Sequence, residues 1–385
     1  MIIHQPEKIV AETDTILWTK VELSKEIAGF PQYLWYRTPN RYGKFFSTRC
    51  DAFLLPGLIA AMGYGEDIEV RGAVSPRLAY HLEEYQSIQK MNFGREVRRT
   101  LIKYDRLEAL EPALDPARNA VGFSFSGGVD SFFTLLKHTP EHLPSSEYQI
   151  SHALFINGFD FVLNKREKYQ NLCRRYKEAL KEIDVELIPM ETNIASMIIT
   201  GLRFNFLYSP TLAGCAISLA GLFKRFIISS SWDYHQLQHS PHTSNPLSDR
   251  MLSTETIEFE HFGANYRRVE KVAAISNWKP AQEHLRVCAQ LDLDDHTLNC
   301  SKCGKCIRTM LPIYTLGKMA SFQTFHKPLR TDRDLLRWAR KFDPYPEYLP
   351  ETVAFLRQHK PGLLLWLFVA TVLGMMRVLM LALLP

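Results

Sequence analysis

The sequence of 385 residues predicts an α/β fold with a parallel, doubly wound sheet. Patterns typical of strands and of helices alternate between residues 120 and 230, as they do when helices connect parallel strands. Two adjacent glycines, Gly127 and Gly128, separate the first of these strands from the first of these helices. Since ligands of such sheets bind at the carboxyl ends of the strands, we expect the loops at that edge to form one site.

The first 115 residues predict a small N-terminal α/β accessory domain. Its strands are expected at residues 15–21, 32–37, 67–74 and 96–104, and its helices at residues 51–62 and 76–90. This region contains no convergent nucleophile, acid–base pair or metal cluster, so a docking role and a purely structural role are both open. Pro112 and Pro116 mark residues 111–119 as a linker.

The core domain is expected at residues 120–325. Its strands are expected at residues 120–125, 151–156, 185–189 and 226–230, and its longer helices at residues 165–183 and 209–223. With 46% hydrophobic and 23% charged residues the chain can bury a large core. The net charge of +5 is compatible with a nucleic-acid partner but does not require one.

The loop Ser126-Gly127-Gly128-Val129-Asp130-Ser131 follows the first core strand and precedes an amphipathic helix. Glycines allow backbone N–H groups to turn toward a bound phosphate, and the positive end of the helix dipole adds to that attraction. Ser126 and Ser131 supply hydroxyl donors, and Asp130 can hold a magnesium ion or a backbone turn. The alternative is a tight turn that needs glycine for backbone reasons alone.

This S-G-G-x-D-S arrangement resembles that of the PP-motif ATP pyrophosphatases, which cleave ATP between its α and β phosphates. The resemblance implies an adenine nucleotide alpha hydrolase-like (HUP) fold, with ATP and Mg²⁺ as ligands. It implies that residues 126–131 hold the phosphates, that Asp130 and Ser131 take part in catalysis, and that the backbone at Phe155 and Ile156 meets adenine. The chain has no G-x-x-x-x-G-K-[ST] motif, which argues against a Walker-type NTPase.

Four of the seven cysteines, Cys288, Cys300, Cys303 and Cys306, have the spacing of a tetrahedral zinc site. Gly304 is expected to permit the tight turn between the last two thiols. A redox pair or disulfide and an iron–sulfur cluster are the alternatives. The N-terminus carries no signal-peptide pattern, which favours a reducing compartment and hence a metal.

The glycine loop followed by this cysteine spacing looks like the 7-cyano-7-deazaguanine synthases. Those enzymes adenylate a carboxylate with ATP and let ammonia displace AMP. The resemblance covers about residues 120–319 and includes Trp232-Asp233-Tyr234, where that family carries an Asp-Tyr near its substrate, so it implies a catalytic role for Asp233. Eleven residues separate Cys288 from Cys300, and residues 234–249 differ from the substrate loop of that family.

Several basic residues and histidines follow the last core strand. A fixed cation stabilises the charge that develops on departing pyrophosphate, which makes Arg267, Arg268, Lys271 and Arg308 candidates for phosphate binding. Their alternative role is that of solvated charges on a helix face. His235, His239, His242 and His261 are expected to be surface residues, as loop histidines usually are. No nucleophile elbow lies near them, which argues against an acid–base role.

The C-terminal segment 362–385 is almost entirely apolar and long enough to cross a bilayer as a helix. We expect it to anchor the protein in a membrane, with the catalytic body in the cytosol. Residues 331–360 are expected to form an amphipathic spacer before it. The alternative is an apolar helix that packs on a partner or on the protein itself.

These observations predict an ATP-dependent ligase that forms AMP and pyrophosphate, adenylates a carboxylate and transfers it to ammonia or an amine. The expected partners are ATP, a small carboxylate or modified-base substrate and, through the tail, a membrane. Two alternatives remain open: an enzyme that thiolates a nucleobase at the expense of ATP, and a membrane-tethered module that binds ATP without turnover.

Overall fold

The computed structural model describes residues 1–109, 119–159, 163–200, 204–239, 242–288, 297–331, 334 and 348–362. The chain divides into two compact units. The first contains Met1–Ser126 and Lys137–Ala264, and the second contains Gly127–Leu136 and Asn265–Pro385.

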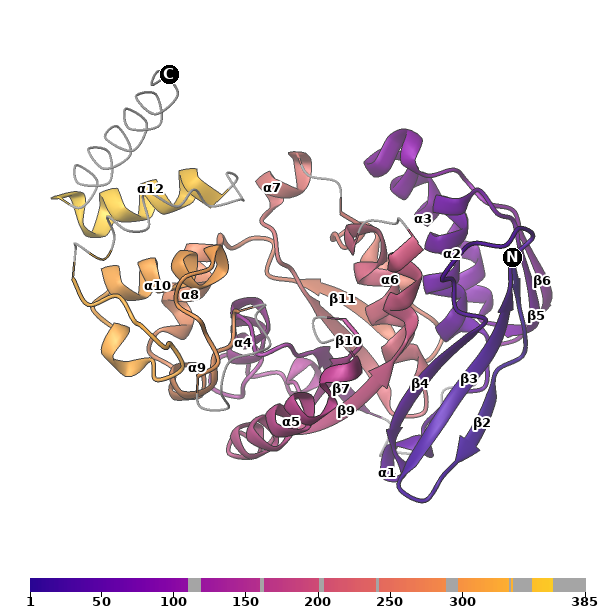
Figure 1. Ribbon diagram of the computed structural model, residues 1–385, viewed down its shortest axis with the longest axis horizontal. Coiled ribbons are helices and arrows are strands. Elements are labelled where there is room, and N and C mark those ends of the chain that lie inside the picture. Colours follow the sequence, from indigo (N-terminus) through magenta and orange to yellow (C-terminus); the bar gives the residue numbers. More distant parts are fainter. Residues whose placement is uncertain are drawn as a thin grey trace, which may run out of the picture. The chain divides into compact units, whose positions relative to one another are not determined.

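The first unit is built on one mixed sheet, which has 11 strands in the described part of the chain (Figure 1). The strands are β1 (Ile2–Ile3), β2 (Glu7–Val10), β3 (Asp14–Glu22), β4 (Tyr33–Pro39), β5 (Ile68–Val74), β6 (Ile102–Leu107), β7 (Ala120–Ser124), β8 (His152–Asn157), β9 (Glu186–Thr192), β10 (Phe223–Ser229) and β11 (Glu258–Phe262). Their order is β11-β10-β7-β8-β9-β4-β3-β1-β5-β6, and β2 pairs with β3. The neighbours from β11 to β9 are all parallel, which confirms an α/β fold with a large, mostly parallel sheet.

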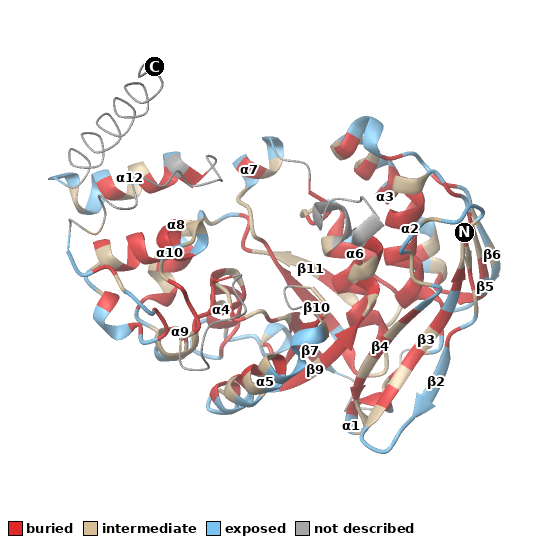
Figure 2. Ribbon diagram, viewed as in Figure 1, coloured by how far each residue is buried: buried red, intermediate tan, exposed pale blue. Residues whose placement is uncertain are grey.

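Helices of the first unit cover both faces of this sheet. They are α1 (Asn40–Gly43), α2 (Asp51–Tyr64), α3 (Pro76–Phe93), α5 (Arg166–Lys181), α6 (Phe204–Ser218) and α7 (Tyr234–His239). On one face, Tyr176 of α5 lies with its ring 5.0 Å from Phe125 and 5.3 Å from Phe155. On the other face, α2 and α6 share a core with alternate residues of the strands, including Leu154 and Phe226. Figure 2 shows buried residues along these elements, whereas β2 is exposed.

The N-terminal strands belong to the same sheet as the core strands. β4 pairs with β9 in antiparallel fashion, with Tyr36 opposite Thr192 and Arg37 opposite Glu191. The observed division of the chain therefore does not follow the expected boundary at residues 115–120. The expected linker lies mainly outside the described residues.

Two expected elements have different bounds, and three strands were missed: β1, β2 and β11. The helix expected at residues 209–223 ends at Ser218, because Phe223 already begins β10. The strand expected at residues 96–104 begins only at Ile102, after α3 ends at a glycine with φ +56°. β1 and β2 have only two and four residues, and the β11 sequence EFEHF is short and half polar, so none of the three has a clear strand pattern.

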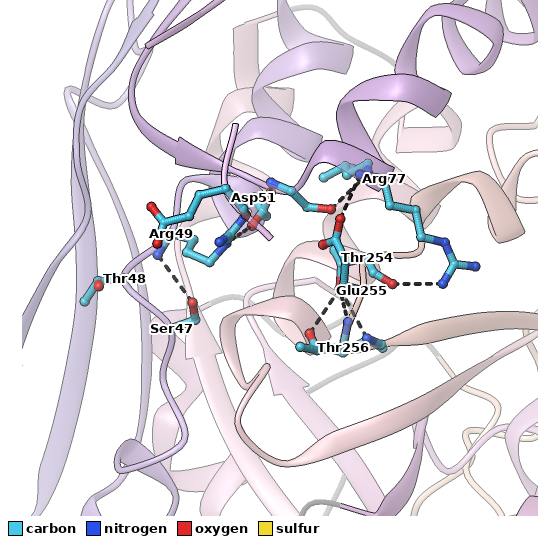
Figure 3. Close-up of polar contacts among 12 residues, drawn as sticks. Ser47, Thr48, Arg49, Asp51, Arg77, Thr254, Glu255 and Thr256 are labelled. Atoms are coloured by element: carbon cyan, nitrogen blue, oxygen red, sulfur yellow. Dashed lines mark hydrogen bonds and ion pairs between the residues drawn. The ribbon is translucent and has the colours of Figure 1, made fainter. Parts of the chain in front are cut away.

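A polar network in the first unit holds the N-terminal ends of α2 and α3 (Figure 3). Arg49 Nε donates to Asp51 Oδ2 at 2.9 Å, and Asp51 Oδ1 accepts from the backbone N–H of Ser75 at 2.7 Å. Glu255 Oε1 accepts from the backbone N–H of Arg77 at 2.9 Å. A carboxylate thus lies at the start of each helix, where the helix dipole favours negative charge.

Replacement of Glu255 by glutamine is expected to destabilise the first unit by about 0.5–1 kcal/mol at neutral pH. Burial opposes ionisation of Glu255, but hydrogen bonds from Arg77 and Ser75 outweigh burial and lower its pKa. The stabilisation is therefore present at neutral pH and lost as the pH falls through that lowered pKa. Denaturant unfolding at several pH values tests this, with Glu84→Gln on the exposed side of α3 as the control. A constant difference across the pH range would contradict the prediction.

The second unit is helical in its described part. Its elements are α4 (Val129–Lys137, of which Lys137 belongs to the first unit), α8 (Arg268–Ile275), α9 (Lys279–His284), α10 (Gly304–Thr315) and α12 (Leu349–His359). The rings of Phe132 and Phe133 in α4 lie 6.0 Å from Trp278 and 4.8 Å from Tyr266, respectively. α8, α10 and α12 pack against one another.

Within the described residues, every helix is too short or too polar to cross a membrane. The tail expected at residues 362–385 lies outside the described residues beyond Gly362, as do residues 332, 333 and 335–347 of the expected spacer. The membrane anchor therefore stays a prediction.

Candidate functional site

The glycine loop makes a tight turn into α4. Gly127 has φ +75°, a left-handed conformation that glycine adopts without strain. Its carbonyl accepts from the backbone N–H of Arg286 at 2.7 Å. The carbonyl of Gly128 accepts from the N–H of Phe132 at 3.0 Å and from the Ser131 hydroxyl at 3.1 Å, so the expected phosphate donor Ser131 also closes the first turn of α4. Val129 begins that helix and is buried.

Asp130, in the first turn of α4, lies between two cations of α8. Its Oδ2 is 3.0 Å from Arg268 Nη1 and its Oδ1 is 3.2 Å from Lys271 Nζ. We call these three residues the Asp130 cluster. The Arg268 and Lys271 side chains are only 9% and 2% exposed, which excludes the alternative of solvated helix-face charges for them. Arg267 is exposed and fits that alternative.

Electrostatics in the Asp130 cluster favour the ion pairs. Burial opposes ionisation of Asp130, but the charges of Lys271 and Arg268 outweigh it and hold the pKa of this carboxyl below its ordinary value. Burial lowers the pKa of Lys271, against the opposing effect of Asp130. The carboxylate therefore stabilises two charges that are otherwise costly to bury.

The arrangement of the Asp130 cluster fits an anion better than a cation. Both oxygens of Asp130 contact positive groups, so a magnesium ion at this carboxylate would be repelled by two neighbouring cations. Nε of Arg268 is buried and has no hydrogen-bond partner among the described residues. A phosphate oxygen is the acceptor that such a donor lacks.

Arg308, also expected to bind phosphate, lies in α10 close to the Asp130 cluster. Its guanidinium carbon is 3.9 Å from the ring centroid of Tyr348, and the residue is buried. Burial raises the pKa of Tyr348 to about 12, while Arg268 and Arg308 act in the opposite direction. Arg268 and Arg308 are thus both close to Tyr348.

Phe155 and Ile156, expected near adenine, lie at the end of β8 in the first unit. The Phe155 ring stacks on Tyr169 at 5.1 Å, and its carbonyl accepts from the Tyr169 hydroxyl at 2.8 Å. Ile156 is buried as well. The next residue, Asn157, donates to Glu191 Oε1 at 3.3 Å, and its buried Oδ1 has no partner among the described residues. Asn157 ends β8 at the carboxyl edge of the sheet, where the site is expected.

Asp233, the expected substrate-facing carboxylate, caps α7. Its Oδ1 accepts from the backbone N–H of Gln236 at 2.8 Å, and its own N–H donates to Gln236 Oε1 at 3.0 Å. This is a reciprocal capping box, which the Asp-x-x-Gln pattern predicts. Asp233 belongs to the first unit and Asp130 to the second, so their convergence in one site stays a prediction.

Two of the four histidines expected at the surface are buried in the first unit. His261 Nδ1 is 2.7 Å from Asp249 Oδ2, with side chains 2% and 0% exposed. Asp249 also accepts from the hydroxyls of Ser209 at 2.5 Å and Ser244 at 2.8 Å. Burial lowers the pKa of His242. His235 and His239 are exposed, as expected.

The four expected metal ligands come together in the second unit. All four Sγ atoms of Cys288, Cys300, Cys303 and Cys306 lie within 4.8 Å of one another. The Cys288–Cys303 and Cys300–Cys306 sulfur pairs are each 3.8 Å apart. Four sulfurs at about 2.3 Å from one zinc ion are separated by about 3.8 Å, whereas a disulfide needs about 2 Å. The cluster thus fits a metal such as zinc and not a disulfide.

The thiols of this cluster also need a cation to ionise together. A hydrogen bond with Cys288 contributes most to raising the pKa of Cys303, which reaches about 11. The pKa of Cys306 is raised as well, by Cys288 and Cys303. A bound metal reverses this effect, because it stabilises the thiolate forms.

Asn299 positions the cysteine cluster and was missed by the sequence reasoning. Its buried Oδ1 accepts from the backbone N–H groups of Val287 at 2.7 Å and Cys288 at 3.2 Å. Its Nδ2 donates to the carbonyl of Leu285 at 2.8 Å and to Thr324 Oγ1 at 3.0 Å. Asn299 directly precedes Cys300 in the sequence, so these hydrogen bonds fix Cys288 close to Cys300.

The turn within the cluster differs from expectation. Ser301, not Gly304, has the left-handed conformation, with φ +61°. Gly304 instead begins α10, which carries Cys306 in its first turn.

No protein-family model, no curated protein and no solved structure matches the chain. Function is therefore inferred from two side-chain clusters, the Asp130 cluster and the four cysteines.

Proposed function

We propose that the protein is an ATP-dependent ligase that forms AMP and pyrophosphate. It adenylates a small carboxylate and transfers the acyl group to ammonia or an amine. The Asp130 cluster carries the proposal, since it holds two buried cations at the start of the glycine-loop helix. Cleavage between the α and β phosphates builds negative charge on the leaving pyrophosphate, and fixed cations stabilise that charge.

The residues take the following roles in this proposal. Backbone N–H groups of the glycine loop and the start of α4 hold the phosphates, with hydroxyls from Ser126 and Ser131. Arg268 and Lys271 bind the leaving pyrophosphate, and Arg308 supports them. Bound Mg²⁺ would neutralise phosphate charge, and Asp130 would hold it once Arg268 and Lys271 contact the phosphates instead of this carboxylate. By resemblance, the backbone at residues 155–156 meets adenine and Asp233 faces the carboxylate.

Zinc has a structural role in this proposal. Four thiolates complete a tetrahedral site and leave no position for a substrate. The cysteine cluster would then stabilise the second unit without taking part in the reaction.

Nucleobase thiolation is the weaker candidate because it needs a reactive cysteine outside the metal site. Burial raises the pKa of Cys50 and of Cys173 to about 12, and that of Cys215 well above its ordinary value. Thiols with such pKa values form little thiolate at neutral pH.

Product analysis tests the proposed function. The protein is incubated with ATP, Mg²⁺, ammonia and a panel of small carboxylates, and AMP and pyrophosphate are measured. Equal amounts of AMP and pyrophosphate are expected once the correct carboxylate is present. ATP binding without cleavage across the panel would instead indicate a nucleotide sensor, and release of ADP and phosphate would exclude the proposed reaction.

Replacement of Gly127 by valine is expected to reduce AMP formation at least about tenfold, because a left-handed backbone costs a valine about 1–2 kcal/mol and the loop N–H groups move. Gly317→Val is the matched control, since Gly317 has φ +70° and open space around it. Both variants should lose similar stability, but only Gly127→Val should lose activity. Equal activities would remove the loop from the mechanism.

A further inference from the structure

The N-terminal end of α8 is occupied by a carboxylate from α12. The backbone N–H of Val269 donates to Glu351 Oε2 at 3.4 Å. Glu351 is 7% exposed, although it lies in the first turn of α12. Free N–H groups and the helix dipole make such a helix end attractive to anions.

Two cations complete an anion site at this helix end. Arg268 is the first residue of α8, and Lys271 lies one turn further along. Both contact Asp130, and the buried Nε of Arg268 has no hydrogen-bond partner among the described residues. Burial opposes the protonated forms of both cations, whereas the charges of Asp130 and, to a lesser extent, Glu351 favour them. Two carboxylates from different helices thus share one cationic site.

α12 is held in place by contacts near both of its ends. The Tyr348 ring precedes the helix and lies 3.9 Å from the Arg308 guanidinium carbon. Lys360 follows the helix, and its Nζ lies 4.4 Å from the ring centroid of Tyr314. Leu356 is buried between these contacts. These contacts keep Glu351 at the start of α8.

We propose that the N-terminal end of α8, with Arg268 and Lys271, is a binding site for pyrophosphate or the terminal phosphates of ATP, and that Glu351 occupies it as an intramolecular competitor. A phosphate group that binds there displaces the Glu351 carboxylate from Val269 and takes over the free donor of Arg268. The identity of the anion rests on the proposed function, whereas the competition rests on the contacts of Glu351.

Titration with inorganic pyrophosphate tests this competition directly. Isothermal titration calorimetry on the full chain should give a Kd for Glu351→Gln that is lower than that of the wild type by about fivefold or more. Glu270→Gln is the matched control, because Glu270 lies in the same first turn of α8 but is exposed, and glutamine can still accept the 2.7 Å hydrogen bond from the backbone N–H of Arg267. Its replacement should change the Kd by less than about twofold, since exposed charge is screened by solvent and salt.

The outcomes separate this proposal from the proposed function. An unchanged or higher Kd in a Glu351→Gln protein that keeps its metal content and thermal unfolding temperature would overturn the competition, and so would absence of pyrophosphate binding in both proteins. Tighter pyrophosphate binding by Glu351→Gln, without ligase activity on any carboxylate, would support the anion site and contradict only the proposed ligase function. Ligase activity together with equal pyrophosphate affinities of the wild type and Glu351→Gln would contradict only the proposal that Glu351 competes with the anion.

Discussion

Removal of metal from the four-cysteine cluster is expected to unfold the second unit. Structural zinc binding provides about 10–16 kcal/mol in zinc-finger peptides at neutral pH, and the packing of α10 depends on the same segment that carries the ligands. Elemental analysis should find one zinc per chain. A strong chelator should then abolish the cooperative thermal transition of the second unit, and added zinc should restore it.

Cys303→Ser should act in the same direction, because three remaining thiolates bind zinc less tightly. Cys173→Ser is the control, since Cys173 lies in α5 of the first unit and outside the cluster. Iron in the purified protein, or absence of any metal, would contradict the zinc assignment. A Cys303→Ser protein that keeps full stability but loses activity would contradict a structural role.

Asp130→Ala is expected to lower the free energy of unfolding by about 3–5 kcal/mol, because two buried cations lose the carboxylate that both contact. Loss of ATP cleavage in this variant would therefore not by itself identify a role in the reaction. Asp130→Ala combined with Lys271→Met should recover part of the lost stability, since removal of one cation lessens the need for the carboxylate. A double-mutant cycle in denaturant measures this coupling.

The pH dependence gives an independent check on Asp130. Its pKa is lowered in the folded protein, so its stabilisation is present above the ordinary pKa of an aspartate and is lost as the pH falls through the lowered value. The difference between the wild type and Asp130→Asn should therefore shrink in acid. Equal stability of the two proteins at neutral pH would show that the cations do not depend on this carboxylate.

The elements between residues 120 and 230 were predictable because their signals are local. A strand such as β8 is a continuous apolar run, and a helix such as α5 repeats its apolar residues at helical spacing. The pairing of β4 with β9 was not predictable from such signals. It joins residues about 155 positions apart, such as Tyr36 and Thr192, and long-range pairing leaves no periodic trace in either segment.

Some features of the candidate site also have local sequence signals, and others depend on tertiary structure. The spacing of Cys300, Cys303 and Cys306 and the need for glycine at position 127 are local, and the structure agrees with both. The burial of Lys271 is a tertiary effect, because the same residue on an isolated helix would be a solvated charge. The capping role of Asp233 follows from the local Asp-x-x-Gln pattern, whereas a role beside a substrate depends on tertiary structure.

The antiparallel pairing of β4 with β9 also constrains how the chain folds during synthesis. The N-terminal strands leave the ribosome long before β9 does. One edge of β4 therefore stays unpaired until β9 has been synthesised. Conversely, a fragment that begins at residue 120 would present β9 as a bare edge rich in buried apolar residues. Such edges can pair with strands of other molecules and cause aggregation. Because β4 covers this edge of β9, the N-terminal strands protect the chain from that pairing.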